Sequence, residues 1–196
     1  MNTRFFLTLA VVIVLILPLS AQSLINPTLK SSLDKYISHT NNQEWNDVFS
    51  YTYPALFEAV EQDDLKAVME RAYNGMAMHI SNANIVYTSA PIEADGHSFI
   101  RLMYTADIQV ALEPGGIYDH IKPIGAMKDN FVQRYGTQAV TWNEEAKTFA
   151  IKAENTMLAI DMGQNDWKFL DLDPARQEWL EQLLPQTVVE SLIRVE

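Results

Sequence analysis

The most constraining feature of the sequence is a run of alternating residues in its middle third. In FIRLMYTADIQVAL, residues 99–112, every second side chain from Ile100 to Leu112 is apolar except for the hydroxyl of Tyr104. The intervening side chains are a mixture of polar and apolar types. Successive side chains of a strand point to opposite faces of the sheet. The run therefore predicts a long strand with one face on a hydrophobic core.

Further strands are expected on both sides of this run. NANIVYTSAPI, residues 82–92, is rich in β-branched residues, and Asp95-Gly96 predicts a tight hairpin turn into the long strand. Downstream, the segments TQAVTW, KTFAIKA, TMLAIDM and WKFLDL each predict a strand, with turns at NEEA and GQND. Sequential strands joined by short turns make an antiparallel sheet.

The segments before residue 77 have the periodicity of helices. Asn26 and Pro27 are typical of a helix start, and a second helix is expected over residues 44–50. A third helix is expected after a cap at Asp63 or Asp64, and it should end at Gly75. Its expected buried stripe consists of Leu65, Val68, Met69, Ala72 and Met76.

Helices are also expected after the long strand and at the end of the chain. IGAMKDNFVQRYG predicts a short helix closed by Gly136. Residues 174–196 predict a helical extension that begins at Pro174, with Thr187 and Glu190 at capping-box spacing. The order of elements predicts an α+β fold in which the N-terminal helices, the only large cover available, pack on one face of an antiparallel sheet.

The first residues have the pattern of an export signal. Arg4 precedes thirteen apolar or nearly apolar residues and then Pro18, and a small-x-small pattern ends at Ser23. We expect residues 1–23 to be a signal peptide cleaved after Ser23, with Ala21 as the alternative site. An uncleaved N-terminal membrane anchor is the other interpretation, although a span takes about 20 apolar residues. Residues 24–196 then form a single domain that is periplasmic or secreted.

Charge and cysteine content narrow the choice of partners. The net charge is −11, and residues 154–196 carry nine acidic against three basic side chains. Nucleic acids need a basic footprint, so we expect no nucleic acid partner, and no membrane partner once the leader is removed. A basic protein partner and a homodimer remain open. There is no cysteine, so the core must hold the fold without disulfides.

Three segments resemble the nuclear transport factor two-like superfamily, also called the cystatin-like or polyketide-cyclase-like cone. They are EWNDVFSYTYPALF, DDLKAVMERAYNGM and NDWKFLDLD with the downstream LEQLLPQTVVESL. The chain is similar to exported bacterial members over residues 27–185. The resemblance implies a strongly bent sheet wrapped around the helices, with a cavity at the open end of the cone. Some members use this cavity for catalysis, and many only bind a ligand or serve as accessory or dimerisation modules.

The aromatic residues are the candidate binding residues. Residues 45–57 hold five aromatic rings in thirteen positions. If the cone geometry holds, rings of this run lie across the mouth of the cavity, where they either seal the core or contact a small apolar ligand. The candidate ligand-binding residues are Trp45, Phe49, Tyr53, Phe57, Tyr87 and Tyr104.

The titratable residues give little support to a catalytic role. Tyr104 with Tyr87, His79 and Asp107 is the most plausible acid–base set, but Asp107 is three residues from Tyr104 and so belongs to the opposite face of the strand. No two histidines have metal-ligand spacing, so no metal and no cofactor are expected. We therefore expect a non-catalytic module that binds a small ligand or serves an accessory role. The alternatives are an interaction or inhibitor module that acts through its acidic C-terminal face, and a cofactor-free lyase or isomerase.

Overall fold

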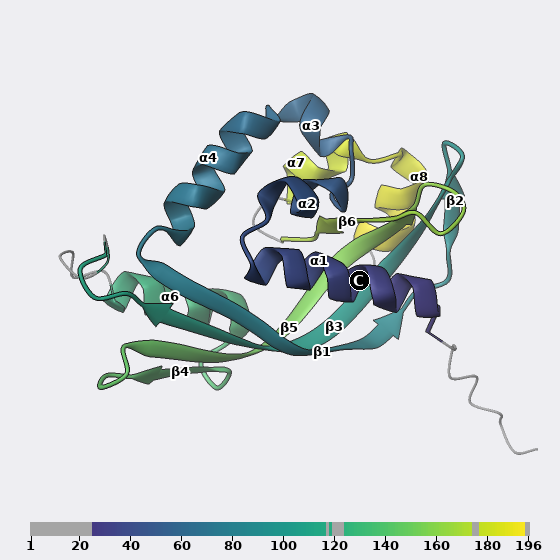
Figure 1. Cartoon of the computed structure of the whole chain (residues 1–196). Coiled ribbons are helices and arrows are strands. Elements are labelled where there is room, and N and C mark those ends of the chain that lie inside the picture. Colours follow the sequence, from purple (N-terminus) through teal and green to yellow (C-terminus); the bar gives the residue numbers. More distant parts are fainter. Residues whose placement is uncertain (1–24, 117, 119–123, 174–176, 195–196) are drawn as a thin grey trace, which may run out of the picture.

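The computed structural model describes residues 25–116, 118, 124–173 and 177–194. Within these ranges it contains one six-stranded antiparallel sheet with helices before, within and after the strand region, which confirms the predicted α+β class (Figure 1). The predicted leader and the expected helix start at Pro174 lie outside the described residues. None of the helices in the described ranges has the length and the apolar character needed to cross a membrane.

The elements follow one another in three groups. The N-terminal helices are α1 (Pro27–Asn41), α2 (Trp45–Ser50), α3 (Leu56–Ala59) and α4 (Gln62–Tyr73). The sheet region holds β1 (Met76–Thr88), β2 (Ile92–Ala94), β3 (His97–Leu112), α6 (Ile124–Tyr135), β4 (Val140–Asn143), β5 (Thr148–Asp161) and β6 (Trp167–Asp171). The C-terminal helices are α7 (Gln177–Leu180), the 3₁₀ turn η2 (Glu181–Leu183), α8 (Gln186–Val188) and the π-helical segment η3 (Val189–Ile193).

The long alternating run forms the central strand, β3. All its even-numbered residues from Leu102 to Leu112 are buried, and Ile100 is partly buried, as the alternation predicts. β3 pairs with β5 over fourteen residue pairs, from Ser98–Asp161 to Ala111–Thr148. The strand order is β1-β3-β5-β4, with β2 paired to β3 and β6 paired to β5.

Helix α1 covers the even-numbered face of β3. It begins as predicted, with Pro27 at its first position and the Asn26 side chain accepting a hydrogen bond from the backbone N–H of Thr28 at 2.9 Å. Leu29, Leu33 and Ile37 form its buried stripe. They pack in one cluster with side chains of β3, β5 and β6, namely Leu102, Tyr104, Ala106, Met157, Ala159, Trp167 and Phe169.

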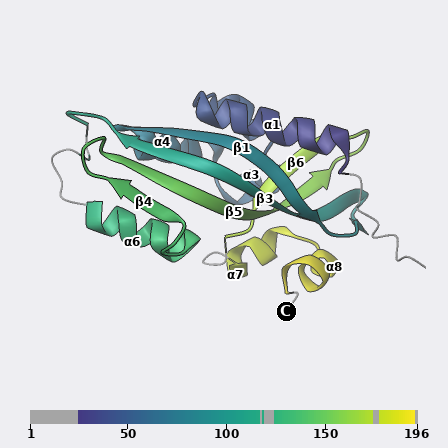
Figure 2. The ribbon, with the colours of Figure 1, turned by 90° about the horizontal axis from the view of Figure 1, so that it is seen from below.

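The sheet is strongly bent, and α1 crosses its hollow side (Figures 1 and 2). The other end of the even-numbered face, with Val110 and Phe149, packs against α6 through Met127 and Phe131. The strands twist along their length, so one face of the sheet can contact helices on different sides of the molecule.

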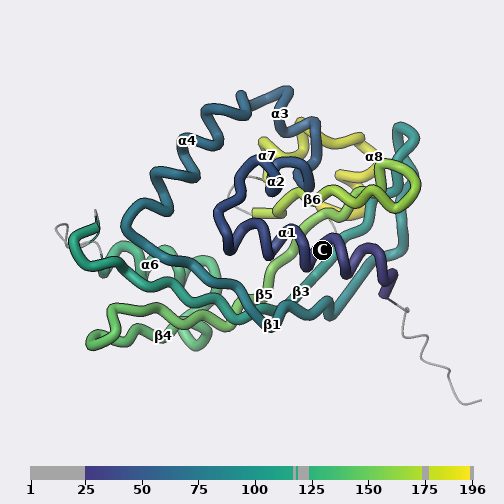
Figure 3. Tube along the Cα trace, viewed as in Figure 1, coloured from purple at the N-terminus to yellow at the C-terminus, as the bar shows by residue number. Residues whose placement is uncertain are grey.

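The chain path in Figure 3 shows α2, α3 and α4 arching away from α1 before the chain enters β1.

The opposite face of the sheet is also covered, which corrects one expectation. Phe99 and Leu158, on that face, are fully buried and pack with Leu180, Val188 and Leu192 of the C-terminal helices. Figure 2 shows α7 and α8 on the far side of the sheet from α1. The expectation that the N-terminal helices are the only large cover was therefore wrong, because the odd-numbered positions of β3 are apolar at its start.

Several local expectations also differ from the structure. KTFAIKA and TMLAIDM are one continuous strand, β5, because the polar residues between them, such as Asn155, pair in register with β3. The N-cap residue of helix α4 is Glu61, two residues before Asp63 and three before Asp64, and Val68 is 55% exposed because only part of the helix meets the core. Glu190 accepts a side-chain hydrogen bond from Gln186 and lies in a π-helical segment, so the capping box with Thr187 is not formed.

Candidate functional site

The aromatic run of residues 45–57 is held against the last strand by backbone hydrogen bonds. The N–H of Tyr53 donates to the carbonyl of Phe169 at 3.0 Å, and the N–H of Phe169 donates to the carbonyl of Tyr51 at 2.7 Å. Thr52 and Phe169 form a parallel bridge between these bonds. The segment that follows α2 therefore extends the edge of the sheet beside β6. This pairing determines where α2 and its rings lie.

A cavity of about 230 Å³ lies between this segment and the helices around it. Its wall is mostly aromatic and aliphatic, and α1, α2, α4, β6 and α7 all contribute. The principal apolar lining residues are Tyr36, Phe49, Leu65, Met69, Phe169 and Trp179. The Tyr36 and Phe169 rings contact each other with centroids 5.4 Å apart. Cavities that bind small ligands usually have this mainly apolar wall with a few polar groups.

The polar groups of the cavity are an ion pair from two distant parts of the chain. Arg134 lies in the last turn of α6, which ends at Gly136 with a φ of 88°, in the left-handed region that favours glycine. Its Nη2 donates to a carboxylate oxygen of Asp171, at the end of β6, at 2.8 Å. Burial alone lowers the pKa of Arg134, but the Asp171 carboxylate outweighs it and the pKa is raised.

Three tyrosines, Tyr36, Tyr104 and Tyr135, interact electrostatically with Asp171, and a fourth, Tyr73, interacts with Tyr135. Burial raises the pKa of Tyr36 and of Tyr104 far above the usual range, and the Asp171 carboxylate adds to both shifts. Burial also raises the pKa of Tyr73 to about 12, and it raises the pKa of Tyr135 against the opposing effect of Arg134. The phenols therefore stay neutral at physiological pH and can donate hydrogen bonds.

The hydroxyls of Tyr36 and Tyr104 are the most available of these donors. Tyr73 donates a weak hydrogen bond to the Met78 sulfur at 3.6 Å, and Tyr135 interacts with Arg134. No described residue makes a hydrogen bond to the hydroxyl of Tyr36 or Tyr104. Tyr36 lines the cavity, so its hydroxyl can donate a hydrogen bond to a polar atom of a ligand.

Three of the six candidate binding residues cluster in one place. Trp45 is buried with its ring edge-on to Tyr73, with centroids 4.9 Å apart. Phe49 lines the cavity and is also edge-on to Phe57, at 5.5 Å. Trp45 and Phe57 thus support the cavity wall from behind, while Phe49 forms part of it.

The other three candidates separate. Tyr104 is buried on the even-numbered face beneath α1 and is electrostatically coupled to Tyr36. Tyr53 packs edge-on against Phe99, with centroids 6.0 Å apart, in the cluster under the C-terminal helices. Tyr87 is 50% exposed on β1. Phe49 thus lines the cavity, Tyr104 is coupled electrostatically to Tyr36 in its wall, and Tyr53 and Tyr87 lie away from it.

Comparison with known proteins gives no family for this chain. It matches no protein-family model, no curated protein and no solved structure. The function must therefore be argued from the geometry alone.

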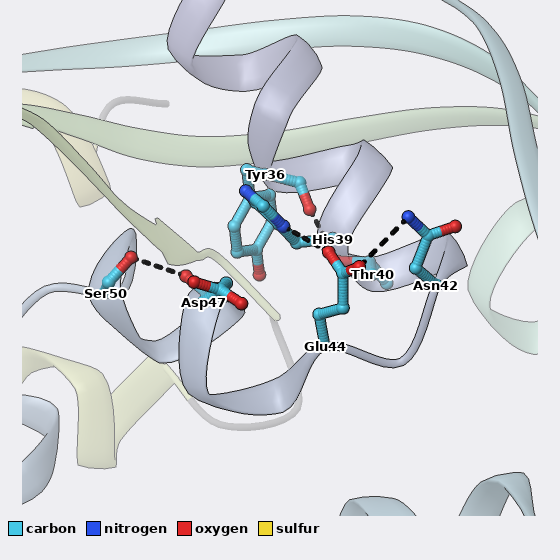
Figure 4. Close-up of polar contacts among 7 residues, drawn as sticks. All are labelled: Tyr36, His39, Thr40, Asn42, Glu44, Asp47 and Ser50. Carbon is cyan, nitrogen blue, oxygen red and sulfur yellow. Dashed lines mark hydrogen bonds and ion pairs between the residues drawn. The ribbon is translucent and has the colours of Figure 1, made fainter.

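One cluster of possible metal ligands is present among the described residues. His39, Glu44 and Asp47 place one ligand atom each within 4.8 Å of one another (Figure 4). His39 Nδ1 lies 2.5 Å from a Glu44 carboxylate oxygen, and Glu44 and Asp47 are exposed. His39 is in the last turn of α1, and the two acids are at the start of α2, which are the positions favoured by the helix dipoles. The ion pair and these helix-dipole positions account for the cluster. It contains one histidine and two acidic residues, so a search for paired histidines in the sequence could not have found it.

The acid–base set considered from the sequence is not assembled. Asp107 is hydrogen-bonded to Lys152 at 2.7 Å and to Asn82 at 2.8 Å on the sheet surface, and these bonds lower its pKa. His79 and Tyr87 are exposed on β1. Tyr104 therefore faces the buried space without any of these partners. The cavity can bind and orient a molecule, but Asp107, His79 and Tyr87, the residues considered for proton transfer, lie on the sheet surface.

Proposed function

We propose that the protein is an exported, non-catalytic module of the nuclear transport factor two-like kind that binds one small amphipathic molecule in the cavity between α1, α2, α4 and β6. The observation that carries the proposal is the composition of this cavity. Its wall is formed by rings and aliphatic side chains such as Phe49 and Met69, and one end is formed by the Arg134–Asp171 ion pair.

The size and polarity of the cavity restrict the ligand. A volume of about 230 Å³ is below the ~300–1,000 Å³ typical of sites for drug-sized molecules. The ligand is therefore a small compound with an apolar body and one polar group that accepts a hydrogen bond. The apolar body lies against Phe49 and Phe169, and the polar group lies near Arg134 and the hydroxyl of Tyr36.

Ligand binding is tested by thermal shift with a library of small amphipathic compounds, followed by calorimetry on each hit. Met69→Trp places a large ring in the cavity and should abolish binding, because Met69 lines the cavity. Val68→Trp is the matched control, since Val68 precedes Met69 in the same helix and is 55% exposed. We expect Val68→Trp to bind every hit with unchanged affinity.

Two results would contradict the proposal. One is a library without a hit for the wild-type protein. The other is a set of hits whose affinities are the same in Met69→Trp and Val68→Trp, because that result would place the ligand outside the cavity.

A further inference from the structure

Arg101 occupies an unusual position on β3. It lies on the odd-numbered face of the sheet, which carries the fully buried Phe99 and Leu158 and is covered by the C-terminal helices. Its backbone N–H donates to the Ser89 hydroxyl at 3.0 Å. Its side chain has one long hydrogen bond, from Nη1 to the carbonyl of Leu192 at 3.4 Å. A guanidinium is therefore held in a mostly apolar layer by little hydrogen bonding.

The charge of Arg101 is not balanced by a carboxylate in the described part of the chain. The Nε–H is buried without an acceptor, and no ion pair joins Arg101 to a described acidic residue. Other basic side chains of this acidic protein do pair, as Arg134 does with Asp171 and Arg194 with Glu181. Arg101 is only partly buried, and its unused N–H donors can bind an anion.

A cavity of about 120 Å³ lies beside Arg101, between the sheet and the C-terminal helices. Thr156 of β5 adds a hydroxyl to its wall, and Leu180 and Ile193 supply apolar surface. Gln177 also borders it, but its amide N–H already donates to Glu181 at 3.0 Å. The wall of the cavity thus combines the Arg101 guanidinium with polar and apolar side chains, Asp173 among them, and its volume suits a compound of only a few carbon atoms.

Asp173 restricts which anion can enter. Its carboxylate lines the same cavity and also acts on Arg134 and Tyr135. A dianion such as phosphate would bring a second negative charge toward this carboxylate, and the repulsion would oppose binding. A monocarboxylate brings one charge, which the guanidinium can bind with two parallel hydrogen bonds.

We propose that the cavity beside Arg101 is a second binding site, specific for a small monocarboxylate with a short apolar tail. The carboxylate lies on the Arg101 guanidinium and the tail lies against Leu180 and Ile193. The proposal goes beyond the ligand of the first cavity, which lies on the other side of Leu180.

The test is calorimetric titration of the full chain with butyrate, with 1-butanol and inorganic phosphate as comparison compounds. We expect butyrate to bind, and butanol and phosphate to bind at least tenfold more weakly. Arg101→Gln should weaken butyrate binding at least tenfold, because it removes the charge and most of the donors. Lys152→Gln, on the exposed surface of the same sheet, is the matched control and should leave the affinity unchanged.

One further variant completes the experiment. Ile193→Trp fills the cavity from its apolar side and should also abolish binding, which keeps the test informative if Arg101→Gln does not fold. The proposal is overturned if the wild-type chain does not bind butyrate, or if Arg101→Gln and Ile193→Trp bind it as the wild type does.

Discussion

At the scale of single residues, Trp167 joins the first helix to the last strand. Its ring is 4% exposed in the cluster beneath α1, and its Nε1 donates to the Thr28 hydroxyl at 3.0 Å. Trp167→Ala leaves a large void and should lower the free energy of unfolding by ~3–5 kcal/mol. Trp167→Phe keeps a ring and loses the hydrogen bond, so it should cost less than the alanine variant. Urea unfolding measures both, and a loss below about 1 kcal/mol for the alanine variant, typical of surface sites, would refute this role.

The candidate site shows which residues a sequence can reveal. Phe49 and Tyr104 were predicted because a dense aromatic run and a single hydroxyl on an apolar strand face are local patterns. Arg134 and Asp171 were missed, because their pairing depends on where α6 ends relative to β6 and no local pattern records it. Tyr36 was not among the candidate binding residues, and its place at the cavity follows from the packing of α1 on the sheet.

At the scale of elements, the predictions succeeded where the local chemistry demands one conformation. Asp95 and Gly96 form the hairpin turn with φ values of 50° and 78°, as the dipeptide predicts. Predictions failed where tertiary contacts decide. β5 continues through Glu154, Asn155 and Thr156 because β3 offers partners along its whole length, although those residues favour a turn in isolation. The C-terminal helices cover a second face of the sheet, which only the complete fold reveals.

The C-terminal helices are therefore expected to be part of the core. Leu192 of η3 is 4% exposed and packs in the cluster with Phe99 and Leu158. Leu192→Ala should lower the free energy of unfolding by ~2–5 kcal/mol, because it opens a void under the sheet. The adjacent Ser191→Ala is the control, since Ser191 is exposed and should change stability by less than about 0.5 kcal/mol. Equal stability of the two variants in urea unfolding would show that the extension is only loosely attached.

At the scale of the whole molecule, the sheet lies between two sets of helices, and the two cavities lie next to each other at its edge. The mainly apolar cavity lies by the N-terminal helices, and the cavity beside Arg101 lies under the C-terminal ones. Leu180 and Asp173 border both cavities, so the two sites share part of their walls. A chain without cysteine has no disulfide to fix these wall residues, so their positions depend on core packing.

The buried tyrosines give the whole fold a predictable response to alkali. A phenol in the unfolded chain ionises near pH 10, whereas burial raises the pKa values of Tyr36, Tyr73 and Tyr104 in the folded protein. Above about pH 10 the unfolded chain releases protons that the folded protein retains. The stabilisation is therefore complete below that pH, and the free energy of unfolding falls as the pH rises, by up to about 1.4 kcal/mol per pH unit for each tyrosine.

Urea unfolding at a series of pH values, with phenolate absorbance as a second signal, measures this slope. Tyr104→Phe removes one of these groups. The free energy of unfolding should then fall less steeply above pH ~10, by up to about 1.4 kcal/mol per pH unit relative to the wild type. Tyr87→Phe is the control because its ring is half exposed on β1, and its slope should equal that of the wild type. An identical slope for Tyr104→Phe and Tyr87→Phe would mean that the Tyr104 phenol is solvated in the folded protein, which would contradict its burial beneath α1.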